Sequence, residues 1–339
     1  MKAASFRKRS RFSIRERGGI GMKKAAAWLM TAVLLLAMLT SVASAEEPSY
    51  HIGICQLQQH AALEDATQGF IDAVTQQMDG QCQVSVRNAS GDPGTCISIV
   101  NAFLAEDVDL ILANSTQALQ AASAATGDTP ILGVAVTDYP AALDMSIWEG
   151  VTGINVSGTS DLAPLDAQAA LMQAMFPDAK QVGLLYCSSE VNSGYQVRTI
   201  RQHMEKLGFT CTDYAFTDTN DVFSVAQSAC QGSDVLFVPT DNTIASCTEL
   251  LRNVIEMERV PVIGGDEGIC SGCGVATICI NYYDLGYATG LMACDILLGK
   301  TDIAQLPIAY SPTFTQVVNA EMCEYLGVTI PEGYAPIGE

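Results

Sequence analysis

The sequence predicts an α/β protein with two similar lobes, each built on a doubly wound parallel sheet. Three observations lead to this fold class. Short β-rich runs alternate with segments of helical spacing, which is the pattern of parallel strands joined by crossover helices. Several β-rich runs are continuously apolar, as expected for strands buried on both faces. The order of these runs in the first half of the chain is repeated in the second half.

The expected strands are short runs bounded by polar or glycine-rich segments. In the first half they span residues 51–57, 83–88, 110–113, 131–136 and 152–156. In the second half they span residues 182–186, 210–215, 235–238, 260–264 and 274–280. The segments between them carry apolar residues at helical intervals, as at Leu63, Phe70 and Val74, which predicts helices with one buried face.

Three pairs of segments carry the repeat. They are HIGICQLQQH (51–60) and QVGLLYCSSE (181–190), VDLILANST (108–116) and SDVLFVPTDNT (233–243), and TPILGVAVTD (129–138) and VPVIGGDEG (260–268). The partners stand 125 to 131 residues apart, and all three pairs occur in the same order. A nearly constant interval of this kind favours two lobes of one topology.

The N-terminus has the features of a secretory signal peptide. Residues 25–42 form an apolar core behind Lys23 and Lys24, and Ala43-Ser44-Ala45 follows as a small-x-small cleavage site, so we expect export and cleavage after Ala45. A retained membrane anchor is the alternative, because the apolar core reaches the lower limit of a spanning helix. Met22 is a possible true start of the chain.

The charge balance argues against nucleic-acid binding. Residues 1–45 contain nine of the 17 basic residues and one of the 37 acidic residues, so their removal leaves 8 basic and 36 acidic side chains. A net charge of -28 repels phosphate backbones and anionic lipid headgroups. We therefore expect no nucleic acid as a partner. We also expect a small-molecule ligand and a monomeric protein.

All 12 cysteines lie beyond the predicted cleavage site. One pair, Cys270 and Cys273, forms a C-x-x-C motif in an expected glycine-rich turn at 268–274. With three histidines in the chain, zinc binding has weak support, and a local disulfide or free thiols are favoured over a metal or redox role. No metal and no cofactor is predicted.

Polar, helix-capping residues follow the matched strands in both halves. Ligands of open α/β sheets bind outside the carboxyl ends of the strands, so two lobes that face each other at these ends would form a ligand cleft between them. A hinge between the lobes would let the cleft close. The alternative for each residue alone is helix capping, which every βα loop requires.

At these loops the chain resembles a known family. The motifs are IGICQLQQHAALEDATQGF (52–70), RNASGDPGT (87–95), NSTQALQAA (114–122), VAVTDYPAA (134–142), SSEVNS (188–193), VPTDNTIAS (238–246), GGDEG (264–268) and NYYDLGYATG (281–290). They resemble, in family order, the ABC transporter substrate-binding family that includes binders of tryptophan and other aromatic amino acids, built on the type I periplasmic-binding-protein fold. The chain departs from the family in its many cysteines, in Cys187 where asparagine is common, and in lacking a lipobox cysteine.

The resemblance implies a division into lobes and a cellular setting. One lobe would comprise residues 46–160 and 267–305, and the other residues 161–266 and 306–339, with hinges at 159–161 and 264–268. The protein would be exported to the periplasm or cell surface and would serve an ABC permease in the membrane. The ligand would be an amino acid, first aromatic and second another apolar one, with sugars third.

A zwitterionic amino acid needs donors for its carboxylate and acceptors for its ammonium. For the carboxylate we expect Asn114, Ser115 and Thr116 at a helix N-terminus, assisted by Thr137. For the ammonium we expect Asp241, with Glu190 or Asp138 second. Further candidate contacts are Gln56, His60, Asn192, Ser193 and Asn242.

Three residues have a second interpretation that the sequence leaves open. Asp266 either contacts the ligand or fixes the hinge. Tyr139 and Tyr186 are the aromatic residues nearest to the expected cleft and could form a wall for the ligand side chain, but both could equally belong to the core.

Two other functions stay open at this point. The motifs G-x-S-x-G, H-E-x-x-H, the P-loop and G-x-G-x-x-G are absent from the sequence, so we predict no catalytic residues, with an amino-acid-converting enzyme as the less favoured alternative. The other alternative is a sensory protein that presents a small solute to a receptor.

Overall fold

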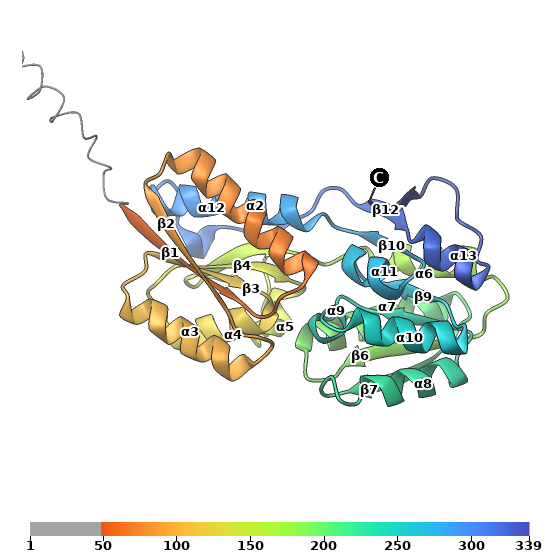
Figure 1. Cartoon of the computed structure of the whole chain (residues 1–339). Helices are drawn as coiled ribbons and strands as arrows, with labels where there is room; N and C mark the ends of the chain where they lie inside the picture. Colours follow the sequence, from red (N-terminus) through yellow and green to blue (C-terminus); the bar gives the residue numbers. More distant parts are fainter. Residues whose placement is uncertain (1–48, 339) are drawn as a thin grey trace, which may run out of the picture. The chain divides into compact units, whose positions relative to one another are not determined.

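The computed structural model describes residues 49–338, and it has the predicted α/β architecture with two sheets (Figure 1). The predicted signal peptide and Met22 lie outside the described residues. Within residues 49–338, no helix combines the length and the apolarity needed to cross a membrane.

The first sheet carries the N-terminal lobe. Its strands are β1 (Tyr50–Gln56), β2 (Cys82–Asn88), β3 (Leu110–Asn114), β4 (Ile131–Val136), β5 (Val156–Ser160) and β11 (Ala309–Tyr310), in the order β11-β5-β4-β3-β1-β2. All neighbouring strands are parallel. Its helices are α2 (Ala61–Met78), α3 (Pro93–Ala105), α4 (Thr116–Ala125), α5 (Tyr139–Ala142), α12 (Tyr282–Leu297) and the short 3-10 helix η1 (Ile303–Gln305). In Figure 1, α2 and α12 cover one face of the sheet and α3 and α4 the other.

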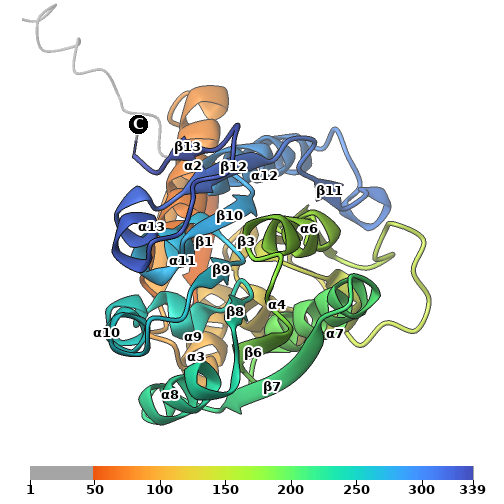
Figure 2. The same ribbon diagram turned by 90° about the vertical axis from the view of Figure 1, so that its right-hand side faces the viewer.

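The second sheet carries the other lobe. Its strands are β6 (Gln181–Cys187), β7 (Thr210–Phe216), β8 (Val235–Val238), β9 (Val262–Gly264), β10 (Ala276–Cys279), β12 (Thr315–Val318) and β13 (Ala335–Pro336), in the order β13-β12-β10-β9-β8-β6-β7. Its helices are α6 (Leu165–Met175), α7 (Val191–Lys206), α8 (Val222–Gly232), α9 (Asn242–Ala245), α10 (Thr248–Glu258), α11 (Glu267–Cys273) and α13 (Ala320–Leu326). Figure 2 shows α6 and α7 on one face of this sheet and α8, α10 and α11 on the other.

The two sheets repeat one topology. The order β5-β4-β3-β1-β2 in the first corresponds strand by strand to β10-β9-β8-β6-β7 in the second. The three segment pairs found in the sequence are the pairs β1 and β6, β3 and β8, and β4 and β9. Each lobe has its own core of buried hydrophobic residues between sheet and helices, so the repeat is one of fold as well as of sequence.

The chain crosses between the lobes three times, and two of these crossings lie at other residues than expected. The first crossing follows Ser160, near the expected hinge at 159–161. The second was expected at residue 267, but α11 and β10 belong to the second lobe, so the chain crosses after Cys279. The third follows Tyr310 and not residue 305, because β11 pairs with β5. The physical reason is sheet completion: β10 is the fifth strand of the second sheet, as β5 is of the first.

The C-x-x-C motif lies in a helix and not in the expected turn. Asp266 starts α11 by accepting a hydrogen bond from the Ile269 amide at 2.8 Å, and the helix runs through Cys273. Cys270 and Cys273 are fully buried, and burial raises the pKa of both thiols. All 12 cysteines lie in the described part of the chain and are unpaired there. Buried, protonated thiols are poor nucleophiles and poor metal ligands.

Strand β5 lies four residues later than expected, in a run whose buried serine hydroxyls find backbone carbonyls as hydrogen-bond acceptors. Its sequence, Val-Ser-Gly-Thr-Ser, is largely polar, yet all five residues are buried. Ser157 Oγ donates to the Leu306 carbonyl at 2.9 Å, and Ser160 Oγ donates to the Thr137 carbonyl at 2.8 Å. Because these hydrogen bonds offset the cost of burial, a run with little apolar character forms a central strand.

Helices α2 and α12 pack with their backbones in close contact. A Cβ atom added to Gly286 would collide with the backbone carbonyl of Ala66, and one added to Gly69 would collide with that of Tyr283. At the edges of this contact the Tyr283 hydroxyl donates to Asp72 at 2.8 Å. The absence of side chains at the glycines therefore sets the distance between the helices.

We predict that Gly286→Ala lowers the free energy of unfolding by about 1–3 kcal/mol, because overpacking a close backbone contact forces the two helices apart. Gly127→Ala is the matched control: a Cβ there meets nothing within 4 Å, and the change should stay within about 0.5 kcal/mol. Urea unfolding of the purified variants measures both. Equal midpoints for the two variants would contradict the close packing of α2 on α12.

Candidate functional site

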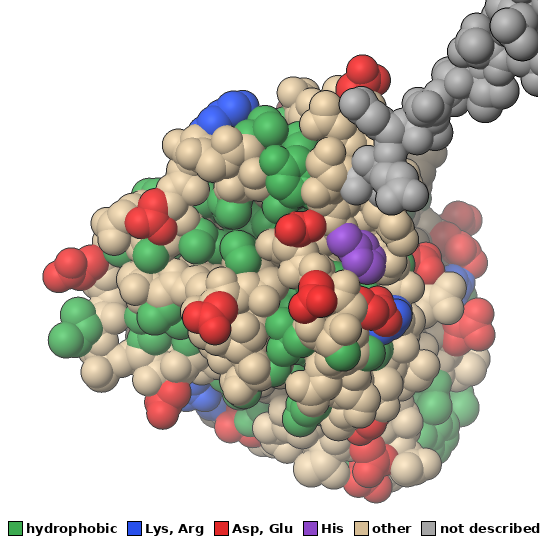
Figure 3. Space-filling view, turned by 90° about the vertical axis from the view of Figure 1, so that its left-hand side faces the viewer, with side chains coloured by type: hydrophobic (Ala, Val, Ile, Leu, Met, Phe, Trp, Pro, Cys, Tyr) green, Lys and Arg blue, Asp and Glu red, His purple; other side chains and the backbone are tan. Residues whose placement is uncertain are grey.

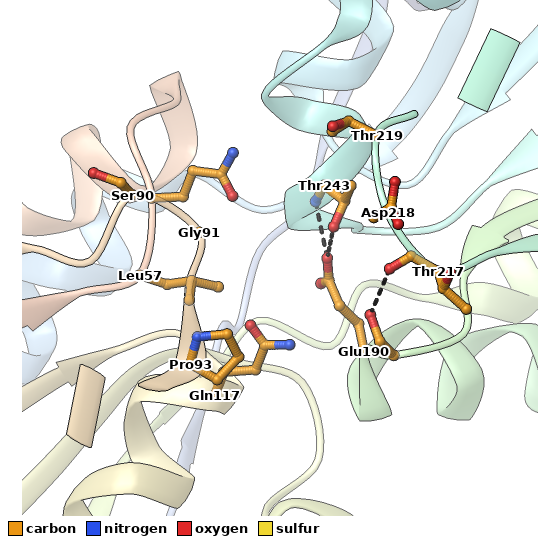
Figure 4. A pocket seen from close by; sticks show the side chains of 12 residues that line it. Leu57, Ser90, Gly91, Pro93, Gln117, Glu190, Thr217, Asp218, Thr219 and Thr243 are labelled. Carbon is orange, nitrogen blue, oxygen red and sulfur yellow. Dashed lines mark hydrogen bonds between the residues drawn. The ribbon is translucent and has the colours of Figure 1, made fainter. Parts of the chain in front are cut away.

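A cavity of about 460 Å³ lies between loops of the two lobes (Figure 4). The loops follow β1, β2 and β3 in the first lobe and β6, β7 and β8 in the second, at the carboxyl ends of parallel strands where ligands of such sheets bind. The lining residues are Leu57, Gln58, Ser90, Gly91, Pro93 and Gln117 from the first lobe, and Ser189, Glu190, Thr217, Asp218, Thr219 and Thr243 from the second.

Glu190 is the buried charged residue of this lining, 2% exposed. Its Oε1 accepts hydrogen bonds from the amide and the hydroxyl of Thr243, at 2.8 and 2.7 Å. Its Oε2 accepts from the amide and the side chain of Asn242, at 3.1 and 2.7 Å, and from Asn192 Nδ2 at 3.2 Å. All five donors are neutral, and no ion pair among residues 49–338 includes Glu190. The second-lobe wall therefore carries a negative charge that the described part of the protein leaves uncompensated.

Asp241, which the sequence assigned as the main ammonium acceptor, lies behind this wall and not in it. Its side chain is fully buried. Oδ1 accepts from the Ile244 amide at 2.9 Å, and Oδ2 accepts from the Cys187 amide at 2.7 Å and from Ser193 Oγ at 2.8 Å. Both oxygens of Asp241 thus accept hydrogen bonds from the segments that follow β6 and β8. Glu190, and not Asp241, lines the cavity.

Burial, and secondly the charge of Glu190, raise the pKa of Asp241 from 3.8 to about 8. Burial also raises the pKa of Asp266 to about 6. Between pH 4 and these values the folded protein holds protons that the unfolded chain has released, so folding is stabilised at low pH and this contribution is lost as pH rises.

We predict that the free energy of unfolding decreases between pH 5 and pH 8 and that Asp241→Asn makes this decrease smaller. The variant is less stable overall, because an amide cannot accept all three hydrogen bonds, but the slope against pH is the relevant quantity. Urea unfolding at several pH values gives the slope. The same slope in wild type and variant would show that Asp241 titrates alike in both states.

The predicted carboxylate-binding residues mainly build the local structure. Ser115 is fully buried at φ 123°, a region that few residues other than glycine adopt, and its hydroxyl caps α4 through the Ala118 amide at 3.2 Å. Asn114 Nδ2 donates to the Leu63 carbonyl at 2.8 Å and to Thr67 Oγ1 at 2.9 Å. Thr116 is also buried. Gln117, one residue further on, is the part of this segment that lines the cavity.

Two predicted residues, His60 and Asn242, meet across the lobes, with His60 Nε2 3.2 Å from Asn242 Oδ1. Burial lowers the pKa of His60, so the imidazole is neutral near pH 7 and supplies no positive charge. A second link joins α7 to the first lobe, where Gln196 Nε2 donates to Thr137 Oγ1 at 3.4 Å. The sequence predicted three of these four residues and missed Gln196.

The other predicted residues hold the loops in place and do not line the cavity. Gln56 accepts from Thr67 Oγ1 at 2.7 Å and donates to the Gln58 carbonyl at 2.8 Å. Asp138 and Asp266 cap α5 and α11, respectively. Asn192 donates a hydrogen bond to Glu190, and Ser193 donates one to Asp241.

Neither tyrosine proposed as a wall lies in the cavity lining. Tyr139 fills the core, where its hydroxyl donates to the carbonyls of Gly133 and Thr159 at 3.0 and 3.1 Å. The half-buried Tyr186 is not among the lining residues either. The core interpretation, which the sequence left open, therefore applies to Tyr139.

Most of the lining was missed by sequence analysis. The lining residues Ser90, Gly91 and Thr217–Thr219 follow the edge strands β2 and β7. The sequence repeat is visible in three strand pairs but not in this fourth pair, β2 and β7. Applying the same interval to Asn88 would have pointed to the segment around residue 217 and indicated both loops.

Comparison with known proteins assigns the family. A family model described as "ABC transporter substrate binding protein" matches residues 51–335, and the chain belongs to this family. It is 35% identical over 280 residues to the tyrosine-binding protein of Clostridioides difficile, covering 81% of this chain and 80% of that protein.

Two solved structures with comparable identity are in different states. An ABC domain from Streptococcus pneumoniae in complex with L-Trp is 31% identical, with a TM-score of 0.80 and coverage of 84% of this chain and 96% of that chain. The ligand-free, open structure of a substrate-binding protein with adhesive properties from Clostridium difficile is 35% identical, with a TM-score of 0.65 and coverage of 85% and 99%. The present structure is thus more similar to the complex than to the open form.

Proposed function

We propose that this protein is the exported binding component of an ABC importer and that it binds an aromatic amino acid between its lobes without converting it. The observation that carries the proposal is the cavity with uncompensated Glu190, formed by loops of both lobes. Relatives that bind tyrosine or L-Trp supply the ligand class. Cleavage of the signal peptide after Ala45 and a monomeric state belong to the same proposal.

The cavity offers each part of an amino acid a partner. Glu190 and Asp218 place negative charge on the second-lobe wall for the ammonium, and charge-assisted hydrogen bonds are the strong ones. Gln58 and Gln117 offer neutral donors on the facing wall for the carboxylate, close to the first turn of α4. Leu57 and Pro93 add apolar surface on the same side.

We expect L-tyrosine, L-tryptophan or L-phenylalanine to raise the melting temperature in a thermal-shift screen of amino acids, sugars and nucleosides, since ligand that binds only the folded state stabilises it. Glu190→Gln should weaken binding by about tenfold to a hundredfold, because a charged hydrogen-bonding partner contributes about 1.5–3 kcal/mol.

The matched control is Glu249→Gln, at an exposed glutamate in α10 outside the cavity. It should leave the dissociation constant unchanged in calorimetric titrations. No shift with any aromatic amino acid would refute the ligand class, and equal affinities of the two variants would refute the role of Glu190.

We also expect the lobes to close on the ligand, with the His60–Asn242 and Gln196–Thr137 contacts forming in the closed state. Small-angle scattering should then show a smaller radius of gyration with saturating ligand than without. An unchanged radius despite demonstrated binding would contradict hinge closure.

A further inference from the structure

We propose that the cavity recognises its ligand through a primary ammonium group and does not require the carboxylate, so that decarboxylated aromatic amines form a second class of ligands. This inference rests on the proposed function, because it concerns the same cavity. It goes further in assigning unequal weight to the two charged groups of an amino acid.

The charges of the lining are all of one sign. Of its 12 residues, two are carboxylates, Glu190 and Asp218, and the others are neutral. Asp241 lies behind Glu190, and because its pKa is raised to about 8 it is neutral near pH 7, so the negative charge of this wall lies on Glu190 and Asp218. Glu190 is bound by five neutral donors, which orient it but do not cancel its charge. A bound ammonium would supply the missing positive charge.

The facing lobe offers no cation to a ligand carboxylate. The described part of the first lobe contains two Lys or Arg residues, and both are paired elsewhere: Arg87 with Glu106 at 2.6 Å, and Lys300 with Asp295 at 3.1 Å. Figure 3, a view onto this lobe, shows acidic side chains scattered over the surface and few basic ones. The usual countercharge for a carboxylate, an arginine, is therefore missing from this wall.

The helix ends at the cavity are also largely occupied. At the start of α3, Asp92 accepts from the Thr95 amide at 2.8 Å and from Thr95 Oγ1 at 2.7 Å, and Pro93 has no N–H to offer. At the start of α4, Ser115 already caps the Ala118 amide. What is left for a carboxylate on this side is the Ser90 hydroxyl, Gln58, Gln117 and the first amides of α4, all neutral groups in an acidic surrounding.

The two groups should therefore contribute unequally to affinity. A neutral amide that donates to a ligand carboxylate forms a hydrogen bond with one charged partner, whereas an ammonium beside Glu190 forms one with two charged partners and adds direct Coulomb attraction. In this cavity the net acidity adds to the attraction of the ammonium and subtracts from that of the carboxylate. Loss of the ammonium should thus be far more damaging than loss of the carboxylate.

Three compounds that differ by one group each test this by isothermal titration: L-tyrosine, tyramine and 3-(4-hydroxyphenyl)propionate, with L-tryptophan, tryptamine and indole-3-propionate as a second series. We expect the amine to bind within about tenfold of the amino acid, and the acid without an amino group to bind at least about a hundredfold more weakly.

The outcomes separate this inference from the proposed function. If the amino acid binds and the amine does not, or if the acid binds as well as the amine, the inference is overturned while the proposed function stands. If no amino acid of either series binds, the proposed function fails, and the inference fails with it, because the amines are then no second class of ligands.

A pair of variants checks the origin of the preference. Asp218→Asn removes an exposed charge from the lining and keeps an oxygen for the Asn220 amide, which Asp218 Oδ1 now binds at 2.8 Å. It should reduce the difference in affinity between the amine and the acid. Asp221→Asn, an exposed neighbour outside the lining with no side-chain cap bond, is the control and should leave the difference unchanged. An equal difference in wild type and Asp218→Asn would overturn the electrostatic argument.

Discussion

The hydrogen bonds that neutral groups donate to Glu190 are the interaction on which the second-lobe wall depends. They join the loop after β6 to the first turn of α9, which follows β8. Asp241 joins the same two loops from behind, through Cys187 and Ser193. Each of the two side chains accepts several hydrogen bonds from fixed neutral donors, so the loops are joined without a cation. The same arrangement that holds the wall together leaves it negatively charged.

The repeated strand order explains why the cavity wall of the second lobe lies opposite a similar wall of the first lobe. In each lobe, the chain leaves the carboxyl ends of neighbouring parallel strands at one edge of the sheet, and six of these loops supply the cavity lining. The three crossings between the lobes follow β5, β10 and β11. The buried residues on either side of these crossings form two separate cores, which is the arrangement that the proposed closure of the lobes requires.

The sequence predicted the fold closely, because buried parallel strands are continuous apolar runs and the interval between equivalent strands is nearly constant. It failed where polar residues are buried. The hydroxyl-rich strand β5 lay beyond the expected range, since only the folded structure reveals the acceptors of Ser157 and Ser160. The second crossing was misplaced because completion of a sheet is a tertiary requirement that no local pattern records.

For the cavity, the sequence predicted the edge of the sheets at which it lies and one buried residue of its lining, Glu190. It could not separate residues that line the cavity from those that hold a loop, because both are polar and follow strands. In the structure, Ser115 and Asp241 accept hydrogen bonds from backbone amides at the starts of α4 and α9, respectively. The edge strands β2 and β7 are half exposed, so their weak apolar signal hid the loops that contain Ser90 and Asp218.

A crystal structure of the protein with L-tyrosine is the most direct test of the claim that the ligand ammonium neutralises this wall. The account predicts the ammonium nitrogen on the second-lobe side, beside Glu190 and Thr243, with its carboxylate towards Gln117. A ligand bound in the reverse orientation, with its carboxylate against Glu190, or bound outside this cavity, would contradict it.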